Sequence, residues 1–97
     1  MKLTNEKNIS IVELKEEQKR FLLGYQPEST SFTSFEEMEK INKALELSEI
    51  ERSELTPLRN SVVLFYREVE KTFGVDYFYS MLSITAVIDE VIYKGHI

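Results

Sequence analysis

Tight turns are scarce in this chain, because its 97 residues contain only three glycines and two prolines. A β-sandwich of this length needs Gly, Asn or Pro turns at short intervals, whereas long helices need few breaks. Hydrophobic residues make up 42% of the chain, enough for one contiguous core. The sequence therefore predicts a single all-α domain over residues 1–97, a compact bundle of about four helices.

Serine-led capping boxes predict where the first helices begin. A Ser followed three residues later by Glu satisfies free amides at a helix start. Ser10 with Glu13 predicts a first helix that ends at a left-handed cap on Gly24. Ser34 with Glu37 predicts the second helix. A third box at Ser48 predicts a bend and a short turn of helix running to about Leu55.

The last two helices have clear boundary signals. Thr56 before Pro57 predicts a helix start, because proline at the first helical position gives up an amide hydrogen that had no partner. Gly74 is expected to end that helix, and Asp76 to cap a last helix that runs to about Tyr93. A connection this short predicts an antiparallel helical hairpin. The natural arrangement of all four helices is up-and-down.

Apolar residues at helical spacing predict which faces are buried. The second and third helices each carry one such stripe. The stripes are Phe35, Met38, Ile41 and Leu45, and then Leu58, Val62, Phe65, Val69 and Phe73.

The last helix is apolar over about two-thirds of its circumference, more than a bundle helix needs. Its polar strip is narrow and is expected to face solvent: Ser80, Ser83, Glu90 and Lys94. Either this helix is central and packed by the other three, or part of it contacts another chain. Asp89 falls within the apolar arc and needs a partner, for which Arg59 and Arg67 are candidates.

Residues for catalysis or metal binding are sparse. The chain has no cysteine and one histidine, His96, next to its end. The three glycines are scattered, so no phosphate-binding loop is present, and no His is placed to activate a Ser or Thr. The glutamates fall mainly outside the apolar stripes. We therefore expect no enzyme activity, no cofactor and no metal.

Charge and hydropathy argue against two classes of partner, nucleic acids and membranes. The net charge of −5 argues against nonspecific binding of nucleic acid. Residues 77–93 are too polar and too short to cross a membrane, and the first residues lack the apolar segment of a signal peptide. The expected location is the cytoplasm.

These observations favour a small acidic protein-interaction module: an adaptor, inhibitor or immunity-type regulator that acts through helical surfaces. Its usage of Lys, Glu and Ile is similar to that of proteins from low-GC bacteria and their mobile elements. Its partner is another protein or a second copy in a homodimer. The alternative is a dimeric helix-turn-helix transcriptional regulator built from the Ser48–Leu55 segment and the helix from Thr56. The candidate partner-binding residues are Val63, Leu64, Tyr66, Arg67, Tyr79, Asp89 and Tyr93.

Overall fold

The computed structural model describes residues 11–28 and 34–94. Within these ranges it has four α-helices and two 3₁₀ turns, and no strand. The elements are α1 (Glu16–Gly24), α2 (Phe35–Leu45), η1 (Leu47–Glu49), η2 (Arg52–Glu54), α3 (Leu55–Phe73) and α4 (Phe78–Lys94). The predicted all-α class and the approximate helix number are confirmed.

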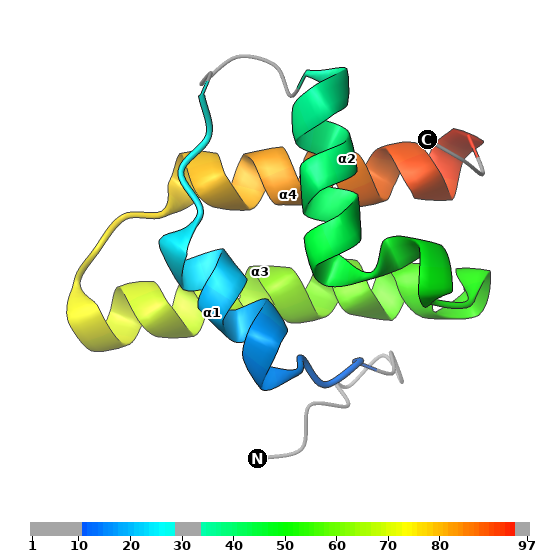
Figure 1. Cartoon of the computed structure of the whole chain (residues 1–97). Helices are drawn as coiled ribbons and strands as arrows, with labels where there is room; N and C mark the ends of the chain where they lie inside the picture. The colour runs from blue at the N-terminus through cyan, green and yellow to red at the C-terminus, as the bar shows by residue number, and fades with distance from the viewer. Residues whose placement is uncertain (1–10, 29–33, 95–97) are drawn as a thin grey trace.

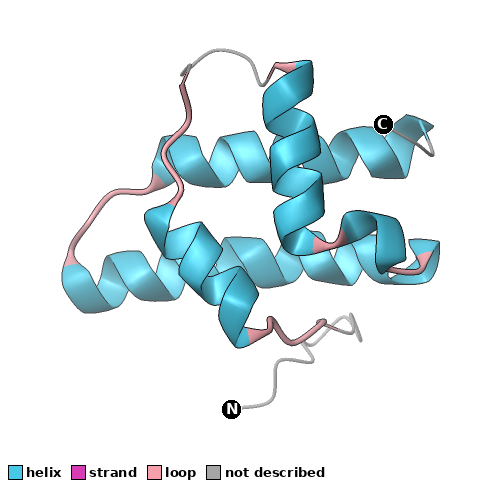
Figure 2. Ribbon diagram, viewed as in Figure 1, coloured by secondary structure: helices cyan, strands magenta, loops and turns pink. Residues whose placement is uncertain are grey.

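Figure 1 shows α3 and α4 side by side and antiparallel, with α1 and α2 lying across them. The predicted hairpin is therefore confirmed, whereas the up-and-down arrangement of all four helices is wrong. Figure 2 shows residues 25–28 leaving the end of α1 without helical structure and the chain bending after α2. The core lies where the helices meet, and its fully buried side chains are Leu22, Ile41, Leu45, Leu58, Val62, Ile84, Val87 and Ile88.

The start of α1 differs from the prediction. Residues 11–15 are not helical, and α1 begins at Glu16 after Lys15, whose amide donates to Gln18 Oε1 at 2.9 Å. The preceding segment instead packs on α3, with Leu14 buried and the Val12 carbonyl accepting from the Ser61 hydroxyl. These tertiary contacts outweigh the local capping signal. Ser10 lies outside the described residues.

The end of α1 also differs from the prediction. Gly24 is the last residue of the helix, and the chain leaves through Tyr25 in an extended conformation with φ −73° and ψ 130°. A left-handed glycine cap is therefore wrong here. Residues 25–28, which include Pro27, are not helical, since proline disrupts a helix interior.

The predicted cap of α2 is confirmed, because the Ser34 hydroxyl accepts from the Glu37 amide at 3.2 Å. Glu46 ends α2 in the left-handed region, with φ 59°, and its carboxylate accepts a 2.8 Å bond from Lys15 Nζ. This bond raises the pKa of Lys15. The predicted bend follows, but Ser48 lies inside η1 and caps nothing there.

The hairpin begins earlier than predicted. Helix α3 follows η2 directly and starts at Leu55, so Thr56 lies inside the first turn and does not cap. Pro57 is still in that turn, where its missing amide hydrogen costs no helical bond. Gly74 ends α3 at φ 68° as predicted. The Asp76 carboxylate accepts from the Phe78 amide at 2.8 Å, at the first residue of α4.

Two members of the predicted buried stripes are exposed, Phe35 and Phe73. Each lies at an end of its helix, Phe35 in the first turn of α2 and Phe73 in the last turn of α3. Helical spacing carries the stripe into these turns, but the neighbouring helices do not cover them. The rest of both stripes is buried or half-buried, as predicted.

Candidate functional site

The inward face of α4 is more polar than the sequence suggested. Ser80, Ser83 and Thr85 are buried together with Ile84, Val87 and Ile88. The Ser80 hydroxyl donates to the Tyr25 carbonyl at 3.1 Å, and the Thr85 hydroxyl donates to the Met81 carbonyl at 2.9 Å. These bonds remove most of the cost of burying a hydroxyl. The expectation that Ser80 and Ser83 face solvent is therefore wrong.

With the serines facing inward, large apolar side chains remain on the outside of α4. Phe78, Tyr79, Leu82 and Tyr93 are 49%, 54%, 43% and 91% exposed. Phe78, Leu82, the exposed Ala86 and Tyr93 recur at helical spacing, which places them along one side of the helix. We call Phe78, Tyr79, Leu82, Ala86 and Tyr93 the α4 stripe.

The apolar surface continues beyond the start of α4. Phe73, at the end of α3, and Val75, in the connection, are both exposed. They lie at the same end of the hairpin as Phe78 and Tyr79. Single exposed hydrophobic residues are ordinary on a soluble protein, but contiguous apolar patches are typical of interaction sites.

Asp89 lies on the same side of α4 as the stripe. Its carboxylate accepts a 2.6 Å bond from Arg59 Nε on α3, and both side chains are partly exposed. Of the two predicted partners, Arg59 is therefore the one that pairs with Asp89, while Arg67 is exposed on α3. Because the two charges compensate each other, Asp89 does not interrupt the apolar stripe with an unpaired carboxylate.

The other predicted partner-binding residues differ in how deeply they are buried. Tyr66 is 2% exposed, and its hydroxyl donates to the Leu22 carbonyl at 2.8 Å. Burial raises the pKa of this phenol. Tyr66 is therefore a core residue, and its assignment to a binding surface is wrong. Val63 is half-buried on α3.

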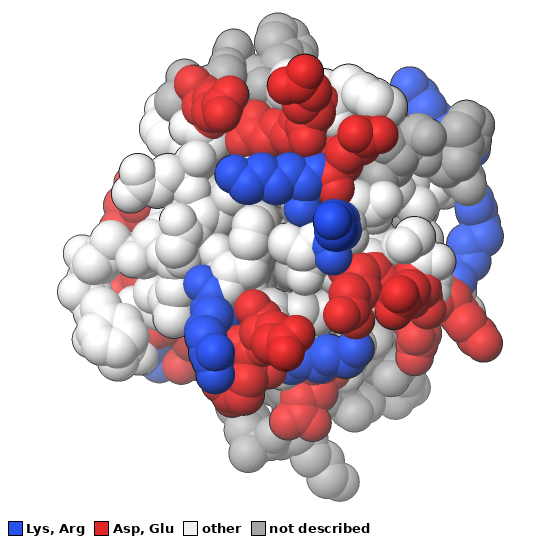
Figure 3. Space-filling model, in the orientation of Figure 1, with Lys and Arg blue, Asp and Glu red and all other residues white. Residues whose placement is uncertain are grey.

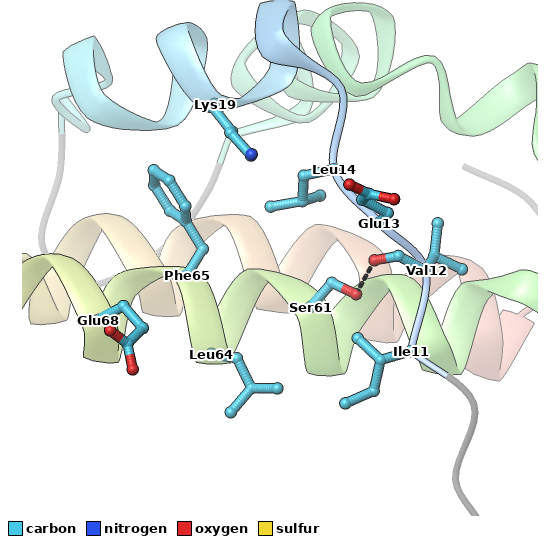
Figure 4. Close-up of a pocket in the computed structure, with 9 residues that line it drawn as sticks. All are labelled: Ile11, Val12, Glu13, Leu14, Lys19, Ser61, Leu64, Phe65 and Glu68. Carbon is cyan, nitrogen blue, oxygen red and sulfur yellow. Dashed lines mark hydrogen bonds between the residues drawn. The ribbon is translucent and has the colours of Figure 1, made fainter. Parts of the chain in front are cut away.

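Leu64 lines a groove of about 270 Å³ between residues 11–14 and α3 (Figure 4). Ile11 and Leu64 lie at its edge, and the bond between Ser61 and Val12 holds the extended segment on the helix. Three charged residues, Glu13, Lys19 and Glu68, join a lining that is mostly apolar and also includes Leu14 and Phe65. The sequence reading missed this groove because it predicted residues 11–14 to be helical.

A second, more polar hollow of about 160 Å³ lies where the connection after α1 meets the start of α2. The Tyr25 hydroxyl donates to the carboxylate of Glu37, which is buried there. Lys40 also lines this hollow, together with Glu28 and Glu36. Figure 3 shows Lys and Arg side chains interspersed with Asp and Glu on this face of the molecule.

In the described part of the chain, no three His, Cys, Asp or Glu side chains come together in a way that could hold a metal ion. None of the described helices combines the length and apolarity needed to cross a membrane. Comparison of the chain with protein-family models, curated proteins and solved structures finds no match.

Proposed function

We propose that this protein is a small cytosolic protein-interaction module that binds its partner through the α4 stripe. One observation carries the proposal: a single helix exposes Phe78, Tyr79, Leu82 and Tyr93 together, each at least 43% accessible. The core takes the opposite, serine-containing face of α4. Folding of the domain alone therefore does not require these outer side chains to be apolar.

The composition of the stripe suits protein binding. Aromatic residues are enriched at the centres of protein interfaces, and tyrosine buries area while keeping a polar tip. The stripe lies on a helix whose other face packs on α3, so its side chains are held on a rigid element. Less conformational freedom is then lost on binding.

An adaptor, inhibitor or immunity-type regulator would use such a surface, because each of these acts by binding a partner protein. The helix-turn-helix alternative gains no support. Its first helix would be the Ser48–Leu55 segment, which instead forms parts of two 3₁₀ turns that run directly into α3. Arg59 lies near the start of the second helix of this motif, where it could contact bases, but it is paired with Asp89.

The experiment compares protein association of three tagged chains expressed in the native host: wild type, Leu82→Glu and Leu23→Glu. Leu23 is a matched control, because it is 44% exposed but lies on α1. After mild chemical cross-linking, we expect the proteins bound to wild type to remain with Leu23→Glu and to disappear with Leu82→Glu.

Circular dichroism and a thermal melt establish that both variants fold. If folded Leu82→Glu retains the same proteins as wild type, the proposal is wrong. Retardation of mixed-sequence duplex DNA that weakens steeply with salt would favour the regulator alternative instead.

A further inference from the structure

We propose that the partner of the α4 stripe is a second copy of this chain, bound by antiparallel pairing of the two α4 helices around a two-fold axis near Ala86. This inference rests on the proposed function, since it names the partner of the same surface. Three features of α4 support it: the spacing of the stripe, the charges at the two ends and the length of the helix.

The stripe is complementary to itself in the antiparallel direction. A two-fold axis beside Ala86, near the middle of α4, places Phe78 of each copy opposite Tyr93 of the other copy. The small side chain of Ala86 then lies at the axis, where the helices approach most closely, and packed helices are separated by about 8–10 Å depending on the side chains between them. An isologous contact of this kind closes the assembly at two copies.

Leu82 lies one helical turn from the axis on each side. In this register it faces the Arg59–Asp89 pair of the other copy, whose 2.6 Å bond already joins opposite charges. No unpaired charge is therefore buried by Leu82, which matters because an uncompensated buried charge is strongly destabilising.

The charges at the two ends of α4 favour the antiparallel direction. Asp76 lies just before the first residue of the helix, and Lys94 is its last residue. Antiparallel pairing places each Asp76 near Lys94 of the other copy, whereas parallel pairing places like charges together. Lys94 also contacts Glu90 in its own copy at 3.1 Å, so the ammonium group would lie between two carboxylates.

The length of α4 determines the affinity that we expect for the dimer. Its 17 residues give a helix of roughly 25 Å, and the exposed Phe73 and Val75 extend the apolar surface at each end of the pair. One helix pair with these additions falls at the low end of the size range of specific interfaces. The expected dimer is therefore in reversible equilibrium with monomer in the micromolar range.

Single cysteines test this geometry cleanly, because the chain contains no cysteine of its own. Under mild oxidation, Ala86→Cys should form a disulfide-linked dimer on the order of tenfold faster than Leu23→Cys, since the dimer raises the effective concentration of the two thiols. Phe78→Cys alone should link no faster than Leu23→Cys. A mixture of Phe78→Cys and Tyr93→Cys should give the mixed disulfide.

Sedimentation equilibrium completes the test without any covalent link. Wild type and Leu23→Glu should dimerise across the micromolar range, and Leu82→Glu should remain monomeric while folded. Rapid self-linking of Phe78→Cys would mean parallel helices and would overturn the antiparallel register. A monomeric wild type, or Ala86→Cys linking no faster than the control, would overturn the homodimer.

The two proposals fail differently. If wild type is monomeric but Leu82→Glu loses a foreign protein in the cross-linking experiment, the homodimer is wrong and the interaction surface stands. If Leu82→Glu dimerises as well as wild type does, and Ala86→Cys does not form a disulfide-linked dimer, another surface mediates association. That result would overturn the α4-mediated homodimer, and the cross-linking experiment would then decide whether the α4 stripe binds a foreign protein.

Discussion

Replacing Tyr66 with Phe tests how the end of α1 is held on the hairpin. The Tyr66 hydroxyl donates to the Leu22 carbonyl at 2.8 Å in a buried position. Leu22 lies in the last turn of α1, where carbonyls have no partner within the helix. The variant keeps the ring but leaves a buried acceptor without a donor. We expect it to lower the free energy of unfolding by about 1–3 kcal/mol.

The same substitution predicts a dependence on alkaline pH. Burial raises the pKa of Tyr66 above its ordinary value of 10.0, so the folded protein keeps this proton where the unfolded chain releases it. Its contribution to stability is therefore complete below about pH 10 and is lost as the pH rises further. Phenylalanine does not titrate. The stability gap between wild type and Tyr66→Phe should narrow above pH 10, by at most about 1.4 kcal/mol per pH unit.

Urea unfolding followed by circular dichroism at several pH values between neutrality and the alkaline range measures this gap. Near neutral pH the variant should also melt lower, by about 4–8 °C for each kcal/mol lost in a domain of this size. Tyr93→Phe is the control, since Tyr93 is 91% exposed, and it should change neither quantity. A gap that is the same at neutral and alkaline pH would refute the argument from burial, and no gap at all would refute the role of the hydrogen bond.

Four further substitutions test the packing by urea unfolding, at protein concentrations low enough for the chain to be monomeric. Leu58→Ala should cost about 2–5 kcal/mol of unfolding free energy because Leu58 is fully buried. Phe73→Ala should change it by no more than about 0.5 kcal/mol because Phe73 is 70% exposed; equal costs would contradict this division. Gly74→Ala should cost about 1–2 kcal/mol, since φ is +68° and an added Cβ meets no atom within 4 Å; a neutral result would argue against the left-handed cap. Asp89→Asn should cost less than about 1 kcal/mol and lose its effect in high salt, because its pair with Arg59 is partly exposed; a larger, salt-independent cost would indicate a buried pair.

The elements that the sequence predicted well depend on local signals. Ser34 caps α2, Gly74 ends α3 and Asp76 holds the first amide of α4, because each signal acts within a few residues. The capping box at Ser10 and Glu13 failed for the opposite reason. There the extended segment gains the burial of Leu14 and a bond from Ser61, which lies far away in the sequence.

The candidate site was only partly predictable. Of the residues proposed from the sequence, Tyr79, Asp89 and Tyr93 lie on the outer side of α4, whereas Tyr66 is buried and its hydroxyl donates to a buried carbonyl. Phe78, Leu82 and Ala86, which we propose as binding residues from the structure, were not among the residues proposed from the sequence. Nothing in the spacing of α4 distinguishes the apolar residues that enter the core from those that remain outside.

The rotation of α4 is decided by its neighbours. A helix that is apolar over most of its circumference can turn several faces toward the core at similar hydrophobic gain. The face containing Ser80 is acceptable because the Tyr25 carbonyl, just past the end of α1, accepts its hydroxyl bond. A small side chain there also leaves room for the end of α1 to approach α4. The aromatic residues are then left exposed on the outside of α4, so the inward serines and the outward stripe are two consequences of the same packing.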